Sequence, residues 1–145
     1  MALERDKKAR GYIASGYFKG IRAPQHIQNQ IIRNYCENND LIFVLSRAEY
    51  AMPRETQSQL WAALKEGFEN IVFYSLHQLP TESEKRHEIL RYCISNDIAL
   101  HFAVEGIIVQ NRKDIIDLEL LITVIELHDT HQNRNSESLA KDLCN

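Results

Sequence analysis

The sequence predicts a single three-layer α/β domain over residues 10–128, built on a mainly parallel sheet. Short apolar runs alternate with segments whose apolar residues recur at helical spacing. The connections are short, and neither an internal repeat nor a linker rich in Pro, Gly and Ser divides the chain. Such alternation is typical of parallel strands joined by right-handed crossovers. We expect about four to five strands, the first four in the order 2-1-3-4.

Several segments have the pattern of buried strands. Each is a short apolar run, rich in β-branched or aromatic residues and closed by turn-forming residues. Residues 41–45, LIFVL, are the clearest example, because an unbroken apolar run is typical of a strand covered on both faces. The predicted strands are 10–14, 41–45, 71–74 and 98–104, with a short fifth strand at 107–109.

Helices are expected between these strands. Pro24 suits the first turn of the first helix, where its missing N–H would be unpaired anyway. A second helix is expected over residues 55–68. Thr81 is the expected N-cap of the third, with Glu84 completing a capping box.

The last predicted helix, residues 112–128 after an Asn111 cap, is apolar around much of its girth. Seven of the ten residues 118–127 are apolar, so more than one side is buried, either inside the monomer or against a second copy. We expect a homodimer through this helix. Its predicted seam consists of Ile115, Leu118, Ile122 and Ile125. Residues 1–9 are expected to be a flexible N-terminus and residues 129–145 a polar C-terminal tail.

Composition and charge exclude several classes of function. A formal net charge of −3 disfavours nucleic acid as a partner and gives no attraction to an anionic membrane. No apolar run is long enough to cross a membrane, and the charged start MALERDKKAR lacks the apolar core of a secretory signal. Cys36, Cys93 and Cys144 form neither a CxxC pair nor a disulfide framework. We therefore expect a cytoplasmic protein that holds no metal and no cofactor.

Polar side chains gather where the predicted strands end. Ligands of open parallel sheets bind outside the carboxyl ends of the strands, so the exit loops are expected to form one pocket for a small sugar-like ligand. The expected ligand-binding residues are Lys19, Arg22, Gln25, His26, Arg47, Tyr50, Ser75 and Gln78. The candidates for proton transfer or nucleophilic attack are Ser15, Glu49, His77, His101 and Glu105.

Several candidates have a structural alternative. Lys19 and Arg22 either bind an anion at the start of the first helix or pair with surface carboxylates. His101 either exchanges a proton with a carboxylate partner or is a hydrogen-bonded core histidine, because it lies inside a predicted strand. Ser15 and Ser75 are either nucleophiles or residues that end strands in turns.

In layout, residues 10–127 resemble the catalytic domain of serine recombinases. GYIAS at 11–15 is similar to that family's GYxRVS-like strand, and a helix with spaced glutamines follows. The resemblance implies a resolvase-like fold, with a flavodoxin-like fold as the alternative. Ser15 is one position short of the nucleophilic serine, Ala14 stands near the expected arginine, and HQLP at 77–80 replaces the DRLxR-like motif. Without guanidinium groups, phosphoryl transfer to serine loses its main electrostatic stabilisation, so recombinase activity is not expected.

A second resemblance extends through most of the domain. The stretches RGYI, EYAMP, FYSLxxLP and HFAVE, and the segment 22–36, are similar to motifs of the sporadic carbohydrate cluster proteins of bacterial surface-polysaccharide gene clusters. This resemblance implies surface carbohydrate biosynthesis, with the chain acting as an enzyme of undefined reaction class on a sugar, sugar phosphate or nucleotide sugar. A non-catalytic binding or regulatory partner with a resolvase-like fold, in the same pathway, is the alternative.

Overall fold

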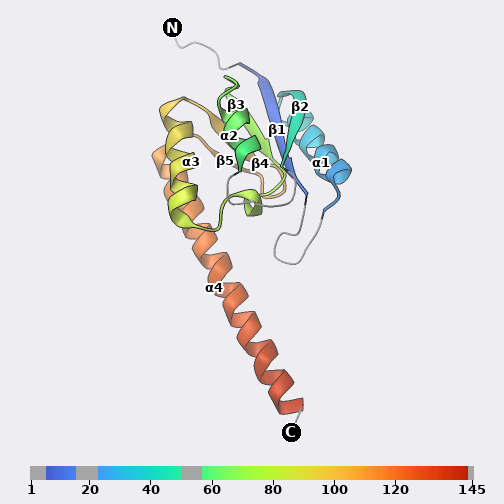
Figure 1. The fold of residues 1–145 in the computed structure, drawn as a ribbon, viewed down its shortest axis with the longest axis vertical. Coiled ribbons are helices and arrows are strands. Elements are labelled where there is room, and N and C mark those ends of the chain that lie inside the picture. The colour runs from blue at the N-terminus through green and yellow to red at the C-terminus, as the bar shows by residue number, and fades with distance from the viewer. Residues whose placement is uncertain (1–5, 16–22, 50–56, 144–145) are drawn as a thin grey trace. The chain divides into compact units, whose positions relative to one another are not determined.

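The computed structural model describes residues 6–15, 23–49 and 57–143 of the chain. The elements follow in the order β1 (Lys8–Ala14), α1 (Gln25–Asn38), β2 (Ile42–Glu49), α2 (Ser58–Leu64), β3 (Asn70–Phe73), the 3-10 helix η1 (Leu76–Gln78), α3 (Ser83–Ser95), β4 (Ala99–Phe102), β5 (Ile107–Val109) and α4 (Arg112–Leu143) (Figure 1). The chain divides after Gln110 into two compact units, and α4 is therefore described separately.

The sheet has the strand order β2-β1-β3-β4-β5, which contains the predicted order of the first four strands. It is mixed rather than mainly parallel as predicted, because β5 runs antiparallel to β4 while the other neighbouring strands pair in parallel. The reversal follows from chain length. Residues 103–106 form the whole connection from β4 to β5, and so short a connection can join only antiparallel neighbours.

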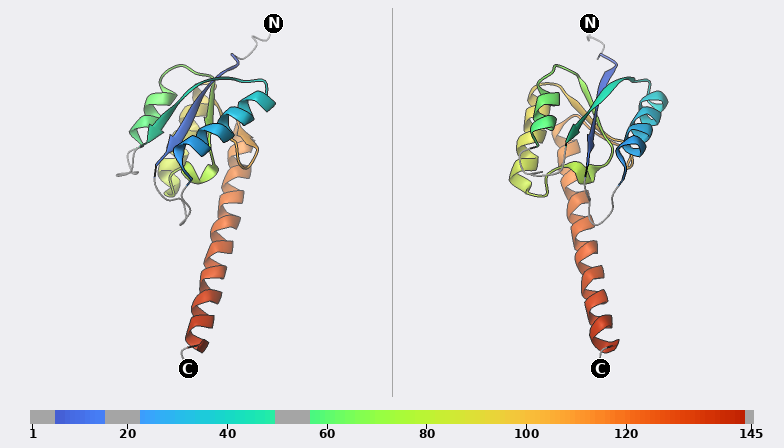
Figure 2. Two further views of the ribbon diagram at one scale, coloured as in Figure 1. Left: turned by 90° about the vertical axis from the view of Figure 1, so that its right-hand side faces the viewer. Right: turned by 45° about the vertical axis from the view of Figure 1, so that its right-hand side comes forward.

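Helices cover both faces of the sheet within residues 6–110. α1 packs on one face over β1 and β2, whereas α2 and α3 lie on the other (Figure 2). The α1 face is closed by a cluster of Ala9, Ile13, Ile32, Tyr35, Cys36 and Val72. Successive side chains of a strand point to opposite faces, so Tyr12, Phe73 and Phe102 pack on the other side, with ring centroids about 5 Å apart. The predicted three layers are present in this unit.

β2 continues to Glu49, beyond the predicted end at residue 45, and it contains a β-bulge. Ala9 pairs with Phe43 but Gly11 pairs with Ser46, so β2 carries one extra residue between these pairs. Leu45 takes up the irregularity with φ of 74°. A Cβ on Gly11 would lie 2.2 Å from Ser46 Oγ, so a larger residue at this position of β1 would force the Ser46 side chain to move.

Two helices differ from the predicted bounds. α2 is shorter than the predicted 55–68, because the chain turns after Leu64 and Gly67 has φ of +94°. α3 begins at Ser83 after Glu82, which makes no side-chain cap, so the predicted capping box at Thr81 does not start this helix. A capping box forms one element earlier, around η1.

α4 is longer than predicted and runs for 32 residues to Leu143, through most of the segment predicted as a polar tail. Its predicted cap is confirmed, since Asn111 Oδ1 accepts a hydrogen bond from Asp114 N at 2.8 Å. Leu118 and Ile122 of the predicted seam are buried. The exposed apolar row is Ile116, Leu120, Val124 and Leu127. Within the described residues, no helix has both the length and the apolar character needed to cross a membrane.

Candidate functional site

Gln28 closes the carboxyl end of β1. It lies in the first turn of α1 and is completely buried. Its amide accepts a hydrogen bond from Ala14 N at 3.1 Å and donates to Ala14 O at 2.8 Å and Ala23 O at 2.7 Å. Gln28 therefore pairs both backbone groups of Ala14, as a neighbouring strand would, and fixes the exit of β1 to α1.

Gln78 closes the end of β3 in the same way. Its Oε1 accepts a hydrogen bond from Tyr74 N at 3.0 Å, and its Nε2 donates to Gln28 Oε1 at 2.9 Å. Its backbone carbonyl accepts from Gln57 Nε2 at 2.9 Å. The exits of β1 and β3 are thus joined through two buried amides.

Glu49, the last residue of β2, ties this strand to α2. Its buried carboxylate accepts hydrogen bonds from Tyr12 Oη at 3.1 Å, Gln59 N at 3.0 Å and Leu60 N at 3.3 Å. A carboxylate that accepts from the first N–H groups of a helix fixes where that helix begins. The Glu49 carbonyl accepts from Ser15 N at 2.9 Å and from Ser15 Oγ at 3.3 Å.

Glu105 links the turn before β5 to the exit of β3. Its carboxylate accepts from Ser75 Oγ at 2.8 Å and from Leu76 N at 2.9 Å. Ser75 Oγ also accepts from His77 N at 3.2 Å. In these contacts Ser75 and Glu105 order the backbone of η1, as capping groups do.

His101 belongs to a different cluster, on the α1 face. Its Nδ1 is hydrogen-bonded to Tyr35 Oη at 2.8 Å, and its Nε2 to Asn70 Oδ1 at 3.0 Å. Asn70 is the first residue of β3 and donates to the Asp6 carbonyl at 2.7 Å. Asn70 and Asp6 lie at the amino end of the sheet, so His101 is bonded away from the exits of β1, β2 and β3. They are those of a hydrogen-bonded core histidine.

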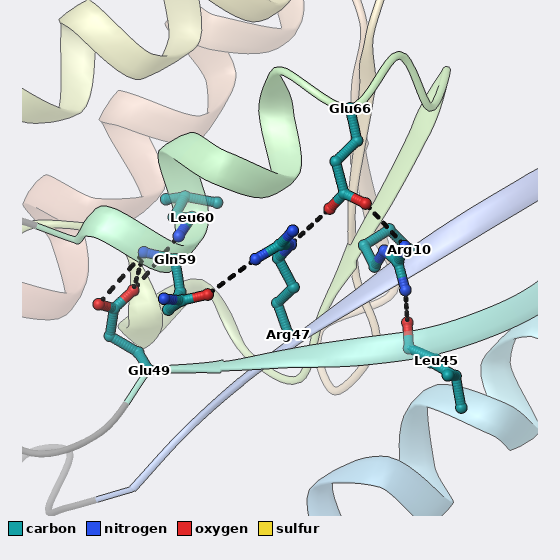
Figure 3. A network of polar contacts seen from close by, with 7 residues as sticks. All are labelled: Arg10, Leu45, Arg47, Glu49, Gln59, Leu60 and Glu66. Atoms are coloured by element: carbon teal, nitrogen blue, oxygen red, sulfur yellow. Dashed lines mark hydrogen bonds and ion pairs between the residues drawn. The ribbon is translucent and has the colours of Figure 1, made fainter.

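Arg47 lies in β2 and joins a charged network under α2, shown in Figure 3. Its Nε donates to Glu66 Oε1 at 2.5 Å and its Nη1 to Gln59 Oε1 at 2.9 Å. The other oxygen of Glu66 accepts from Arg10 Nη2 at 2.7 Å. Burial alone would raise the pKa of Glu66, but the hydrogen bonds and charges of the two arginines hold it below its ordinary value.

The predicted site residues are therefore distributed unevenly. Lys19, Arg22 and Tyr50 lie outside the described residues. Gln25 and His26 open α1, where His26 is exposed. The residues that the structure brings together at the strand exits are Ser15, Glu49, Ser75, His77, Gln78 and Glu105. Arg47 and His101 lie in the two separate networks described above.

The residues that organise these networks, Gln28, Arg10 and Glu66, were not predicted as site residues. Gln28 had a signal, since Gln28, Ile32 and Tyr35 share the buried stripe of α1 at helical spacing. A polar residue in such a stripe needs a buried partner. Arg10 and Glu66 gave no such signal, because they are 56 positions apart and meet only in the folded sheet.

Two further chemistries receive no support within residues 6–15, 23–49 and 57–143. No group of three or more His, Cys, Asp and Glu side chains in these segments is arranged to hold a metal ion. Burial raises the pKa of Cys36 to about 11 and that of Cys93 to about 12, so both thiols stay protonated near neutral pH.

Solved structures match this fold over nearly the whole chain. The N-terminal catalytic domain of TP901-1 integrase has a TM-score of 0.62 and 14% identity, with 86% of this chain and 98% of that chain covered. A resolvase family site-specific recombinase from Streptococcus pneumoniae has a TM-score of 0.60 and 14% identity, with 92% and 97% covered. The chain has a resolvase-type catalytic-domain fold. No protein-family model and no curated protein matches the sequence.

These neighbours correct the predicted function. They are an integrase catalytic domain and a site-specific recombinase, and they give no support to the resemblance to sporadic carbohydrate cluster proteins. The predicted role in carbohydrate biosynthesis, the sugar-like ligand and the exclusion of nucleic acid as a partner are therefore wrong. Net charge is a weak basis for such an exclusion because it averages over the whole surface, whereas nucleic-acid binding depends on local groups. The homodimer through residues 112–128 stays a prediction.

Proposed function

We propose that the chain takes part in DNA recombination and does not itself cut the DNA strand. The first half is supported by the resolvase-type fold, whose neighbours include a protein named as a site-specific recombinase. The second half, the absence of strand cutting, is supported mainly by the hydrogen bond between Gln28 and Gln78. This amide pair occupies the exits of β1 and β3, where cutting would require arginines.

Gln78 lies within HQLP, the residues that stand in place of the DRLxR-like motif. Its side chain is 3% exposed, and both ends of its amide are used in hydrogen bonds to Tyr74, Ser75 and Gln28. An amide buried and bonded in this way stabilises the loop and is turned away from a phosphate in solvent.

The arginines near the sheet also bind the protein itself. Arg10 and Arg47 are ion-paired with Glu66, and the buried Arg86 donates to the carbonyls of Pro80 and Thr81 at 3.1 Å. Phosphoryl transfer requires cationic groups preorganised around the phosphate. Arg10 and Arg47 point to Glu66, and Arg86 points to the carbonyls of residues 80–81, so we infer that these three groups do not clamp a phosphate at Ser15.

Two assays test the two halves of this proposal. Fluorescence anisotropy with a labelled duplex of about 20 base pairs is expected to detect binding that weakens steeply between about 50 and 200 mM salt. A supercoiled plasmid incubated with the protein is expected to remain uncut. Absence of DNA binding at low salt would overturn the first half. Nicking that disappears in Ser15→Ala but persists in the control Ser83→Ala, a serine at the start of α3, would overturn the second.

A further inference from the structure

We propose that Arg10 and Arg47 form a phosphate-binding site under α2, which the chain's own Glu66 carboxylate occupies in this structure. The site is separate from the exits of β1 and β3, and it does not depend on the proposed role in recombination. Figure 3 shows the two guanidinium groups converging on Glu66 from neighbouring strands.

The charges around Glu66 are not balanced. Two guanidinium groups share a single carboxylate, with N···O distances of 2.7 Å for Arg10 and 2.5 Å for Arg47. The cluster therefore carries an excess positive charge, which a phosphate dianion would balance more completely than one carboxylate does. Arginines that converge on one point have the arrangement with which proteins bind phosphate.

One donor of this cluster has no acceptor. Arg10 Nε is buried and has no hydrogen-bond partner, although Nη2 of the same side chain is bonded to Glu66. Nε–H and one Nη2–H share an edge of the planar guanidinium group, so this edge is only half used. A buried donor without an acceptor is costly. Each Glu66 oxygen already accepts from one arginine, whereas a phosphate has further oxygens for Nε.

Glu66 can leave the two arginines without unfolding α2. It follows the end of the helix at Leu64 and precedes Gly67, whose φ is +94° with open space around it. Its side chain is 21% exposed, and that of Arg47 is 36% exposed, so an anion can reach the pair from solvent. Arg10 stays in place when Glu66 moves, because its guanidinium group lies 4.7 Å from the centroid of the Phe68 ring.

The test measures thermal stability of the full chain against inorganic phosphate, with sodium chloride adjusted to constant ionic strength. Wild type is expected to show a phosphate-dependent rise in Tm. Glu66→Gln, which keeps the shape and removes the competing charge, is expected to bind phosphate about tenfold more tightly. Arg47→Gln is expected to lose the response. The control Arg33→Gln should respond as wild type, because Arg33 lies over the Phe43 ring on α1's side of the sheet.

Equal phosphate responses in wild type, Glu66→Gln and Arg47→Gln would overturn the proposal, because phosphate would then bind elsewhere. No response in wild type and Glu66→Gln up to about 50 mM phosphate would also overturn it. A duplex oligonucleotide distinguishes the source of the phosphate group. If the group comes from DNA, Arg47→Gln weakens duplex binding and the duplex competes with inorganic phosphate. A phosphate-dependent rise in Tm without any DNA binding would support the phosphate site and overturn the proposed role in recombination.

Discussion

Gln28 Oε1 accepts a hydrogen bond from Gln78 Nε2 at 2.9 Å, and this contact joins residues 50 positions apart in the chain. Through it, the exit of β1 and the exit of β3 share a continuous buried hydrogen-bond network that also includes Ala14 and Tyr74. The network holds the strand ends at the edge where a resolvase-type fold is expected to work. Its main consequence is rigidity at this edge.

Replacing Gln28 tests this network. Gln28→Ala removes the side chain that bonds the buried backbone groups of Ala14 and the half-buried carbonyl of Ala23, and it is expected to lower the free energy of unfolding by about 2–4 kcal/mol. Urea denaturation measures the change. The matched control is Gln30→Ala, an exposed position of the same helix whose amide donates to Asn34 Oδ1. Equal losses in the two variants would contradict the structural role of Gln28.

Gly11→Ala tests the close approach of β1 to β2. The new Cβ would lie 2.2 Å from Ser46 Oγ, so the variant is expected to lose about 1–3 kcal/mol of stability. Removing the obstructing hydroxyl in Gly11→Ala/Ser46→Ala should restore part of the loss. The free energies of unfolding of the two single variants and the double variant are compared in a double-mutant cycle. Additive effects would show that the two residues do not touch.

The strand pattern and the network differ in how far the sequence predicts them. LIFVL is recognisable as a strand because burial on both faces requires an unbroken apolar run. The second half of β2, SRAE, is polar and becomes a strand only by pairing with β1, which the local sequence does not encode. Glu49 is a candidate for proton transfer from its sequence position alone. Its contacts with the first N–H groups of α2 depend on the tertiary structure, which the local sequence does not encode.

Glu66 is expected to make the free energy of unfolding depend on pH in the acidic range. Its pKa is held below the ordinary value of 4.5, so its ion pairs stabilise the folded state fully above about pH 4.5 and lose this contribution as pH falls through the lowered pKa. Glu66→Gln should therefore be less stable than wild type by about 1 kcal/mol at pH 7. The difference should shrink progressively in urea titrations as pH falls below about 4.5. A difference that stays constant from pH 7 to pH 3 would show that the charge of Glu66 is not the cause.

Tyr35→Phe tests the role of the buried histidine. The variant removes the hydroxyl that lies 2.8 Å from His101 Nδ1 and is expected to cost about 1–2 kcal/mol, because a buried hydrogen bond is lost. DNA and phosphate binding should not change, since His101 lies in a cluster separate from the strand exits and from Glu66. Loss of either binding activity without loss of stability would mean that His101 acts in a site rather than in the core.

The central claim is that this resolvase-type fold works on DNA without cutting it. The most direct measurement is a denaturing gel of the protein incubated with labelled duplex DNA, run beside a native gel of the same mixture. A serine that attacks a phosphate remains covalently attached to the DNA, and such an adduct survives denaturation. We predict a shifted band on the native gel and only free DNA on the denaturing gel. A covalent adduct that maps to Ser15 would contradict the account.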